Sequence, residues 1–191
     1  MRRAAPPGYV VDADGILSGV RYLPSPNCDE RPAGAVVDLL VIHNISLPPG
    51  EYGGEDVVRL FTNTIDYSAH PYYETLRGLR LSTHFLIRRD GEVLQFVPCG
   101  RRAWHAGVSV WQGHSHCNDF SIGIELEGSD REAFTEAQYQ ALGRLARALR
   151  SAYPIRAAAG HSDIAPGRKT DPGPFFDWPR FLAAAGLETP A

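Results

Sequence analysis

The pattern of apolar and polar positions first predicts two buried strands. Residues 36–42 form a nearly continuous aliphatic run, which indicates a strand buried on both faces, and His43 stands at its end. Residues 120–127 alternate strictly between apolar and polar side chains, so only one face of this predicted strand belongs to the core. The other face is small and acidic. It carries Ser121, Gly123, Glu125 and Glu127.

A hairpin and a further short strand are also predicted. The apolar residues 85–87 and 93–97 flank the dipeptide Asp90-Gly91, which readily adopts the positive φ values of a tight turn. The run of small residues at 157–160 leads into His161 and is expected to be a short strand. His43 and His161 thus both follow strands, where α/β sheets commonly present their sites.

Three helices are predicted from spacing and capping signals. Residues 56–62 suggest a short one, and another is expected to start near Asp177, which can cap it. Thr135 and Gln138 resemble a capping box, and apolar residues then follow at helical spacing up to Pro154. This order of elements predicts the α/β class, with a central mixed β-sheet flanked by α-helices in a single domain.

The domain boundaries follow from the same pattern. We assign residues 1–17 to an N-terminal tail, 18–185 to the single domain and 186–191 to a C-terminal tail. Within the domain, residues 46–81 are weakly patterned and rich in proline, glycine and tyrosine. A loop of this size in a compact domain is often a binding loop or a lid.

Composition narrows the possible partners. The chain has 191 residues, 43% of them hydrophobic, which is enough for a core without disulfides. Its net charge of -3 gives no overall positive field, so neither nucleic acid nor a membrane is expected as a partner. The three cysteines, Cys28, Cys99 and Cys117, are far apart and are expected to be buried reduced thiols. With no long apolar stretch, a cytoplasmic location is expected.

Candidate metal ligands come from His43, His161 and a carboxylate. Asp171 stands before a proline, which favours extended geometry, so Asp171 and Lys169 should project to the same side. Two neutral imidazoles and one carboxylate leave zinc an open position for water, as in catalytic zinc sites. We therefore expect one zinc ion (Zn2+) per chain, bound by His43, His161 and Asp171.

Two further charged residues have a candidate role in that chemistry. Glu125 could take a proton from water and pass it to a leaving amine, and Gly123 leaves room beside it on the same strand face. Lys169 could stabilise the oxyanion that forms when water adds to an amide. On residue type alone, both would instead be ordinary surface charges, and only the neighbouring candidate ligands favour the catalytic interpretation.

Other enzyme classes find less support. His161-Ser162-Asp163 matches the opening of a two-histidine, one-carboxylate iron site, but no histidine follows His161. Neither the H-E-x-x-H motif of zinc proteases nor the G-x-S-x-G motif of serine hydrolases occurs. His114, His116 and Cys117 could form a metal cluster, but without a fourth ligand they are more readily interpreted as a loop.

Several long motifs occur in one order between about Ser18 and Phe181. They are YLPSPN at 22–27, VIHNISLPPG at 41–50, LIRRDG at 86–91, RAWHAG at 102–107, CNDFSIGIELEG at 117–128 and the segment 160–174. Together these motifs resemble the bacterial cytosolic anhydro-N-acetylmuramoyl-L-alanine amidases, within the wider amidase and peptidoglycan-recognition superfamily.

The resemblance implies roles that agree with the chemical interpretation. It implies that His43, His161 and Asp171 bind zinc, that Glu125 is the catalytic acid and base, and that Lys169 assists at the oxyanion. It further implies the substrate, which is an anhydromuropeptide split into sugar and free peptide during peptidoglycan recycling. We infer no obligate protein partner. An influence on inducible β-lactam resistance is also implied.

Substrate contacts are implied at four more positions. Asn44, Arg80 and Trp104 match substrate-binding positions of the family, although a core tryptophan and a solvated arginine are the plain alternatives. His116 stands where close relatives often carry an arginine, which implies weaker or more pH-dependent contact with peptide carboxylates. The alternative function is a non-catalytic muropeptide-binding module, but such members are expected to lack one or more zinc ligands.

Overall fold

A six-stranded mixed sheet forms the centre of the fold. The computed structural model describes residues 8–188, so most of the predicted N-terminal tail is described, while 1–7 and 189–191 lie outside the described residues. The strand order is β1-β5-β4-β9-β3-β10, in which only β4 and β5 pair antiparallel. These strands are β1 Arg21–Tyr22, β3 Leu39–Ile45, β4 Phe85–Ile87, β5 Val93–Gln95, β9 Ser121–Glu127 and β10 Ala157–Gly160.

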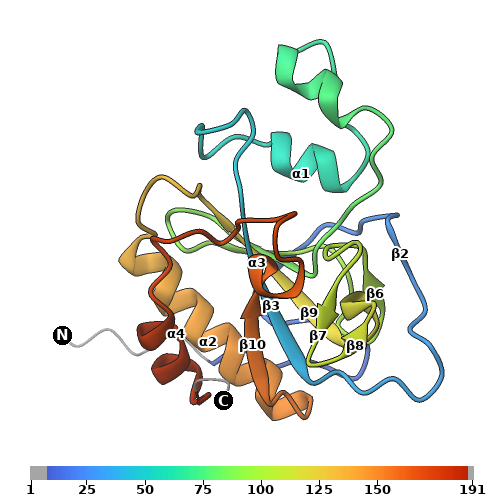
Figure 1. Cartoon of the computed structure of the whole chain (residues 1–191), viewed down its shortest axis with the longest axis vertical. Helices are drawn as coiled ribbons and strands as arrows, with labels where there is room; N and C mark the ends of the chain where they lie inside the picture. The colour runs from blue at the N-terminus through green and yellow to red at the C-terminus, as the bar shows by residue number, and fades with distance from the viewer. Residues whose placement is uncertain (1–7, 189–191) are drawn as a thin grey trace.

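Helices cover this sheet and confirm the predicted α/β class. α2 (Glu136–Ala152) and α4 (Trp178–Ala185) pack against each other on one face of the sheet (Figure 1). The other face is covered by α3 (His161–Ile164) and the segment between β5 and β9. α1 (Asp56–Phe61) and the 3-10 helix η1 (Pro71–Leu76) lie together beyond one end of the strands (Figure 1).

The predicted start of the long helix is confirmed and ties α2 to the sheet. Thr135 Oγ1 accepts a hydrogen bond from Gln138 N at 3.1 Å, and Gln138 Oε1 accepts from Thr135 N at 3.0 Å. Gln138 is fully buried, and its Nε2 donates to the carbonyl oxygens of Ile87 and Glu127. The capping box therefore also fixes the helix against β4 and β9.

The predicted hairpin is confirmed, while two strand predictions need correction. β4 and β5 pair through Ile87 and Val93, and Gly91 has the left-handed φ of 88°. β3 starts later than predicted and runs through His43 to Ile45, so His43 lies inside the strand. β9 is buried on both faces, because the segment between β5 and β9 covers the face predicted to be outside the core.

Several short elements were not predicted, because their two to six residues are too few to show a periodic pattern. Besides β1, η1 and α3, they are β2 Cys28–Asp29, β6 Arg102–Ala103, β7 Val110–Trp111, β8 His114–Ser115 and the 3-10 helix η2 Cys117–Asp119. β2 pairs with β6 and β7 with β8, both antiparallel. The predicted loop at 46–81 contains η1 as well as the predicted short helix, so it is partly ordered as helix.

The remaining expectations concern boundaries, thiols and membranes. Packing begins before Ser18, because Tyr9 and Val11 lie against the core and the backbone N of buried Leu17 donates to Gln95 Oε1, while the domain boundaries themselves stay predictions. All three cysteines are free; Cys99 and Cys117 are buried, and Cys28 is half-buried. In residues 8–188, no helix has the length and apolar character needed to span a membrane.

Buried His84 makes the stability of the fold sensitive to acid. Burial lowers the pKa of His84 to about 3, the Arg31 charge adds to this, and the Arg101 carbonyl opposes it. Between the ordinary value of 6.5 and 3, the unfolded chain binds a proton that the folded chain does not. The free energy of unfolding should therefore fall as the pH drops through this window, by about 1.4 kcal/mol per pH unit for this one group.

Replacing His84 with asparagine tests this expectation. Asn Oδ1 can take the place of His84 Nδ1, which accepts from Gly123 N at 3.0 Å, but it does not titrate. We expect H84N to be less stable than the unaltered protein at pH 7, and the difference to shrink as the pH falls towards 4. Urea unfolding at several pH values measures it, and a difference independent of pH would contradict the assignment.

Candidate active site with a histidine and aspartate group

The site lies on the sheet face opposite α2 and α4. β3 and β9 are parallel neighbours, and His43 on β3 is in register with Glu125 on β9. Side chains two residues apart share a face, so Ser121, Gly123 and Glu125 lie on the side of His43, while Ile122 and Ile124 point into the core beneath α2. The small and acidic face predicted from the alternation is therefore the face that carries the site.

His161 and Asp171 reach the same place from the next strand and the loop after it. β10 pairs with β3 and ends at Gly160, so His161 begins α3 directly beside His43. Ser162 N donates to the Asp171 carbonyl at 2.9 Å, which holds the loop against the start of α3. A Cβ on Gly160 would lie 2.8 Å from Pro172 Cδ, so glycine permits this close approach.

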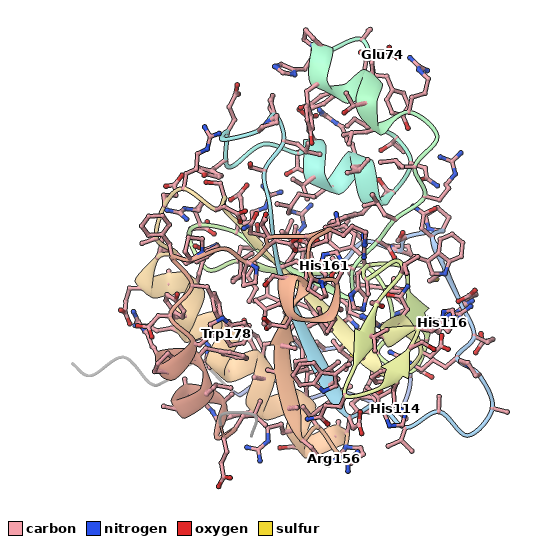
Figure 2. The ribbon with its side chains drawn as sticks, in the orientation of Figure 1. Glu74, His114, His116, Arg156, His161 and Trp178 are labelled. Carbon is pink, nitrogen blue, oxygen red and sulfur yellow. The ribbon has the colours of Figure 1, made fainter. Side chains whose placement is uncertain are left out.

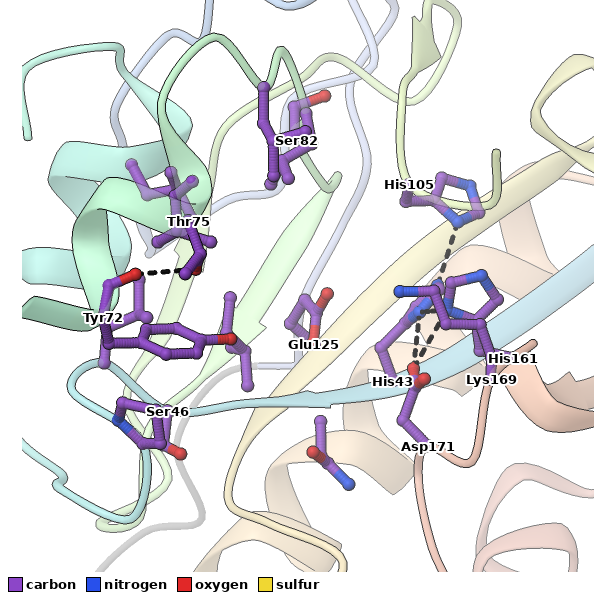
Figure 3. A pocket seen from close by; sticks show the side chains of 18 residues that line it. His43, Ser46, Tyr72, Thr75, Ser82, His105, Glu125, His161, Lys169 and Asp171 are labelled. Atoms are coloured by element: carbon purple, nitrogen blue, oxygen red, sulfur yellow. Dashed lines mark hydrogen bonds and ion pairs between the residues drawn. The ribbon is translucent and has the colours of Figure 1, made fainter. Parts of the chain in front are cut away.

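Three donor atoms of these side chains converge. His43 Nδ1 lies 3.0 Å from His161 Nδ1 and 3.0 Å from Asp171 Oδ2, and His161 Nδ1 lies 3.1 Å from Asp171 Oδ2 (Figure 3). His43 is 1% and His161 4% exposed. His43, His161 and Asp171 therefore form a compact His-His-Asp group, and its three members are the residues predicted as metal ligands.

The protonation states of the His-His-Asp group favour the binding of a cation. His161 Nε2 lies 3.0 Å from the Ala106 carbonyl, which can only accept a hydrogen bond, so a neutral His161 presents a bare Nδ1. Burial lowers the pKa of His43 to about 4, so it is neutral at pH 7. Burial alone would raise the pKa of Asp171, but the contacts with His161 and His43 hold it below its ordinary value.

This donor set can hold a metal ion. Two neutral imidazole nitrogens and one carboxylate oxygen, within 4.8 Å of one another, match the ligand chemistry of zinc sites that leave a position open. Among residues 8–188 this is the one such group that could hold a metal. His114, His116 and Cys117 form no comparable group within the described residues; His114 belongs to β8 and His116 follows that strand, both away from His161 (Figure 2).

Glu125 lies beside the His-His-Asp group, and one of its carboxylate oxygens makes no hydrogen bond within residues 8–188. Glu125 is 9% exposed, and its Oε2 is buried with no hydrogen-bond partner among the described residues. Burial raises the pKa of Glu125 well above its ordinary value; the Asp171 carboxylate adds to this and Lys169 opposes it. A buried carboxyl with a raised pKa is suited to exchange protons near neutral pH.

A cavity of about 500 Å³ joins these residues to the 46–81 segment. One end is formed by the His-His-Asp group, Glu125 and the exposed Lys169. The other end is formed largely by side chains from the 46–81 segment, including Tyr72, Thr75, Leu76 and Leu79. In the view of Figure 3, Glu125 lies between Tyr72 and the His-His-Asp group. The cavity thus combines polar chemistry at one end with an apolar and hydroxyl-bearing wall at the other.

The other predicted substrate contacts are only partly at this cavity. Asn44 lines it, with its Nδ2 donating to Asp130 Oδ1 at 2.7 Å. Arg80 is exposed and Trp104 is half-buried, and neither is among the cavity walls. His116 is exposed at the start of η2, with a left-handed φ of 60°. Substrate contacts by these residues stay predictions.

Two residues at the site were missed by the sequence interpretation. His105 Nδ1 lies 2.9 Å from His43 Nε2, and its ring fills the space that was predicted to lie open beside Gly123. His105 stood within the RAWHAG motif, which was its signal. Tyr72 lines the cavity from η1, and the weak pattern of 46–81 gave no signal for it.

Comparisons with known proteins find amidases. Residues 33–174 match the family model described as N-acetylmuramoyl-L-alanine amidase. The chain is 58% identical over 177 residues to the 1,6-anhydro-N-acetylmuramyl-L-alanine amidase AmpD of Escherichia coli K12, covering 92% of this chain and 97% of that protein.

Solved structures agree with this similarity. A crystal structure of a selenomethionine AmpD derivative superposes with a TM-score of 0.88 at 57% identity, covering 92% of this chain and 98% of the other. The amidase AmiD from E. coli, in complex with anhydro-N-acetylmuramic acid-L-Ala-D-γ-Glu-L-Lys, gives a TM-score of 0.60 at 30% identity, covering 95% and 67%.

Proposed function

The chain belongs to the N-acetylmuramoyl-L-alanine amidase family, and from that premise we propose that it is a zinc-dependent amidase of anhydromuropeptides. It would hydrolyse the amide between anhydro-N-acetylmuramic acid and L-alanine. The observation that carries the proposal is one cavity in which three candidate ligand atoms converge beside a Glu125 oxygen that has no hydrogen-bond partner within residues 8–188. The small-molecule substrate is supported by the similarity to AmpD and to AmiD with its bound muropeptide.

Each residue has a defined task in this reaction. His43, His161 and Asp171 would hold a zinc ion, which would supply Lewis acidity to the scissile carbonyl and to water. Glu125 accepts the proton of the attacking water and returns it to the leaving amine of L-alanine, which its raised pKa favours. Lys169 lines the same cavity end, where its ammonium group can donate to the oxygen that becomes negative.

Mass spectrometry of a synthetic muropeptide tests the reaction. We expect anhydro-N-acetylmuramoyl-L-Ala-D-γ-Glu-L-Lys to be split into the sugar and the free tripeptide. In water labelled with 18O, the label should enter the carboxyl group on the sugar side, since water adds to that carbonyl. The free tripeptide offered alone should remain intact.

Other outcomes would assign a different function. An intact muropeptide that stays bound to the protein would indicate the non-catalytic binding module. A new break within the peptide would indicate a peptidase. The cytoplasmic location and the influence on β-lactam resistance that the resemblance implies stay predictions.

A further inference from the structure

A line of polar groups runs from the His-His-Asp group into the fold, with His43 and Ser121 buried and His105 half-buried. His43 Nε2 lies 2.9 Å from His105 Nδ1, and His105 Nε2 lies 3.1 Å from Ser121 Oγ. Ser121 Oγ in turn lies 2.6 Å from the Cys117 carbonyl. Figure 3 shows His105 directly against His43. His43 and His105 also line the cavity that would receive the substrate, whereas Ser121 and Cys117 do not.

The direction of each hydrogen bond follows from the last acceptor. The Cys117 carbonyl can only accept, so the single hydroxyl hydrogen of Ser121 points to it. Ser121 Oγ can then only accept from His105, which places the proton of a neutral His105 on Nε2. His105 Nδ1 is therefore bare and accepts from His43 Nε2, and this leaves His43 Nδ1 bare as well.

The same short segment orients the second histidine of the group. The carbonyl of Ala106, the residue after His105, accepts from His161 Nε2 at 3.0 Å and from Arg168 at 2.8 Å. Asn118 Oδ1 accepts from the backbone N of His105 at 3.1 Å and of Ala106 at 2.8 Å. One amide side chain thus anchors the two residues on which the orientation of both histidines depends.

Gly123 is part of this arrangement. A Cβ at Gly123 would lie 2.5 Å from His105 Cγ, closer than real Cβ contacts come, so only glycine lets the ring lie over β9. The ring in that place bridges Ser121 on β9 and His43 on β3. The packing and the hydrogen bonds therefore fix the same orientation of His105.

We propose that His105, held by Ser121, is a positioning residue that fixes the tautomer of His43 so that Nδ1 faces the metal. The inference rests on the proposed metal site and adds to it a dedicated hydrogen-bond acceptor for one ligand. Without that acceptor, His43 can carry its proton on either nitrogen, and the Nδ1–H form cannot bind a metal through Nδ1. Partners of this kind commonly contribute about 10- to 100-fold to metal affinity.

Variants of His105 distinguish its role as a hydrogen-bond acceptor from its contribution to packing. H105L fills the space without an acceptor, and we expect its zinc affinity to fall about 10- to 100-fold. H105N places Oδ1 where Nδ1 was and should recover most of that loss. S121A, a change of one atom, should weaken zinc binding less than H105L does, and it provides a test if H105L folds poorly.

A matched control and two readouts complete the experiment. T83V removes another buried hydroxyl bonded to β9, at 2.9 Å from the Gly123 carbonyl, and should bind zinc like the unaltered protein. Zinc affinity is measured by competition with a chromogenic chelator. Long-range 1H–15N NMR of the metal-free protein reports the His43 tautomer, which should be Nε2–H in the unaltered protein and mixed in H105L.

The outcomes distinguish this inference from the proposed function. Zinc affinity in H105L and S121A equal to that of the unaltered protein, with His43 still in the Nε2–H form, would overturn the positioning role and leave the zinc site standing. Failure of the unaltered protein itself to bind zinc would instead refute the proposed function.

Discussion

Replacing Asp171 with alanine should remove metal binding and amidase activity together. Asp171 Oδ2 lies 3.0 Å and 3.1 Å from the Nδ1 atoms of His43 and His161, and it supplies the one negative charge of the His-His-Asp group. Two neutral imidazoles alone hold zinc weakly. We therefore expect the loss in affinity to exceed the roughly 10- to 100-fold typical of outer partners.

Metal analysis and the muropeptide assay on the same preparation check this result. D177A is a suitable control, because Asp177 caps α4 away from the site by accepting from Arg180 N at 3.0 Å. Its loss should lower the free energy of unfolding by about 1 kcal/mol without removing zinc. Full zinc occupancy and normal turnover in D171A would exclude Asp171 as a ligand.

Replacing Glu125 with glutamine should keep the metal and stop the chemistry. Glutamine preserves the shape of the side chain, but it cannot carry a proton from water to the leaving amine. We expect the zinc content to stay at the level of the unaltered protein and kcat to fall by about 10²- to 10⁴-fold, the usual contribution of a general acid and base. Retained zinc distinguishes this variant from D171A.

Glu127 provides the matched comparison on the same strand. It lies two residues further along β9, is also buried, and accepts from the backbone N of Gly53 at 2.7 Å and of Arg89 at 3.0 Å. E127Q should therefore cost stability while kcat per folded molecule changes little. If E125Q turned over like the unaltered protein, Glu125 would not be the base.

The sequence predicted the parts of the fold that have long periodic patterns. The Thr135–Gln138 capping box and the apolar positions behind it define α2, and Asp90-Gly91 defines the β4–β5 turn. The two-residue strands and η1 were not predicted, because periodicity needs more residues than they contain. Their positions depend on tertiary contacts, such as the packing of the 46–81 segment on Leu86 and Phe96.

The His-His-Asp group could be predicted from the sequence, whereas the contacts of His105 could not. His43, His161 and Asp171 each stand at or near a strand end or within a proline-rich segment, and the order of strands brings them together although 128 positions separate His43 from Asp171. The part played by His105 depends on which atoms meet: its Nδ1 on His43 and its Nε2 on Ser121. Such contacts depend on how side chains pack in the folded protein, and a pattern of apolar and polar positions does not predict which individual atoms meet.

Titration of metal-free protein with zinc tests the central claim most directly. The unaltered protein, stripped by a chelator and freed of it, should not cleave the muropeptide. Activity should then rise with added zinc and level off at one zinc ion per chain, and D171A should not respond at these concentrations. Full cleavage by the metal-free protein, or activity that saturates at a different zinc ratio, would contradict a single catalytic zinc held by His43, His161 and Asp171.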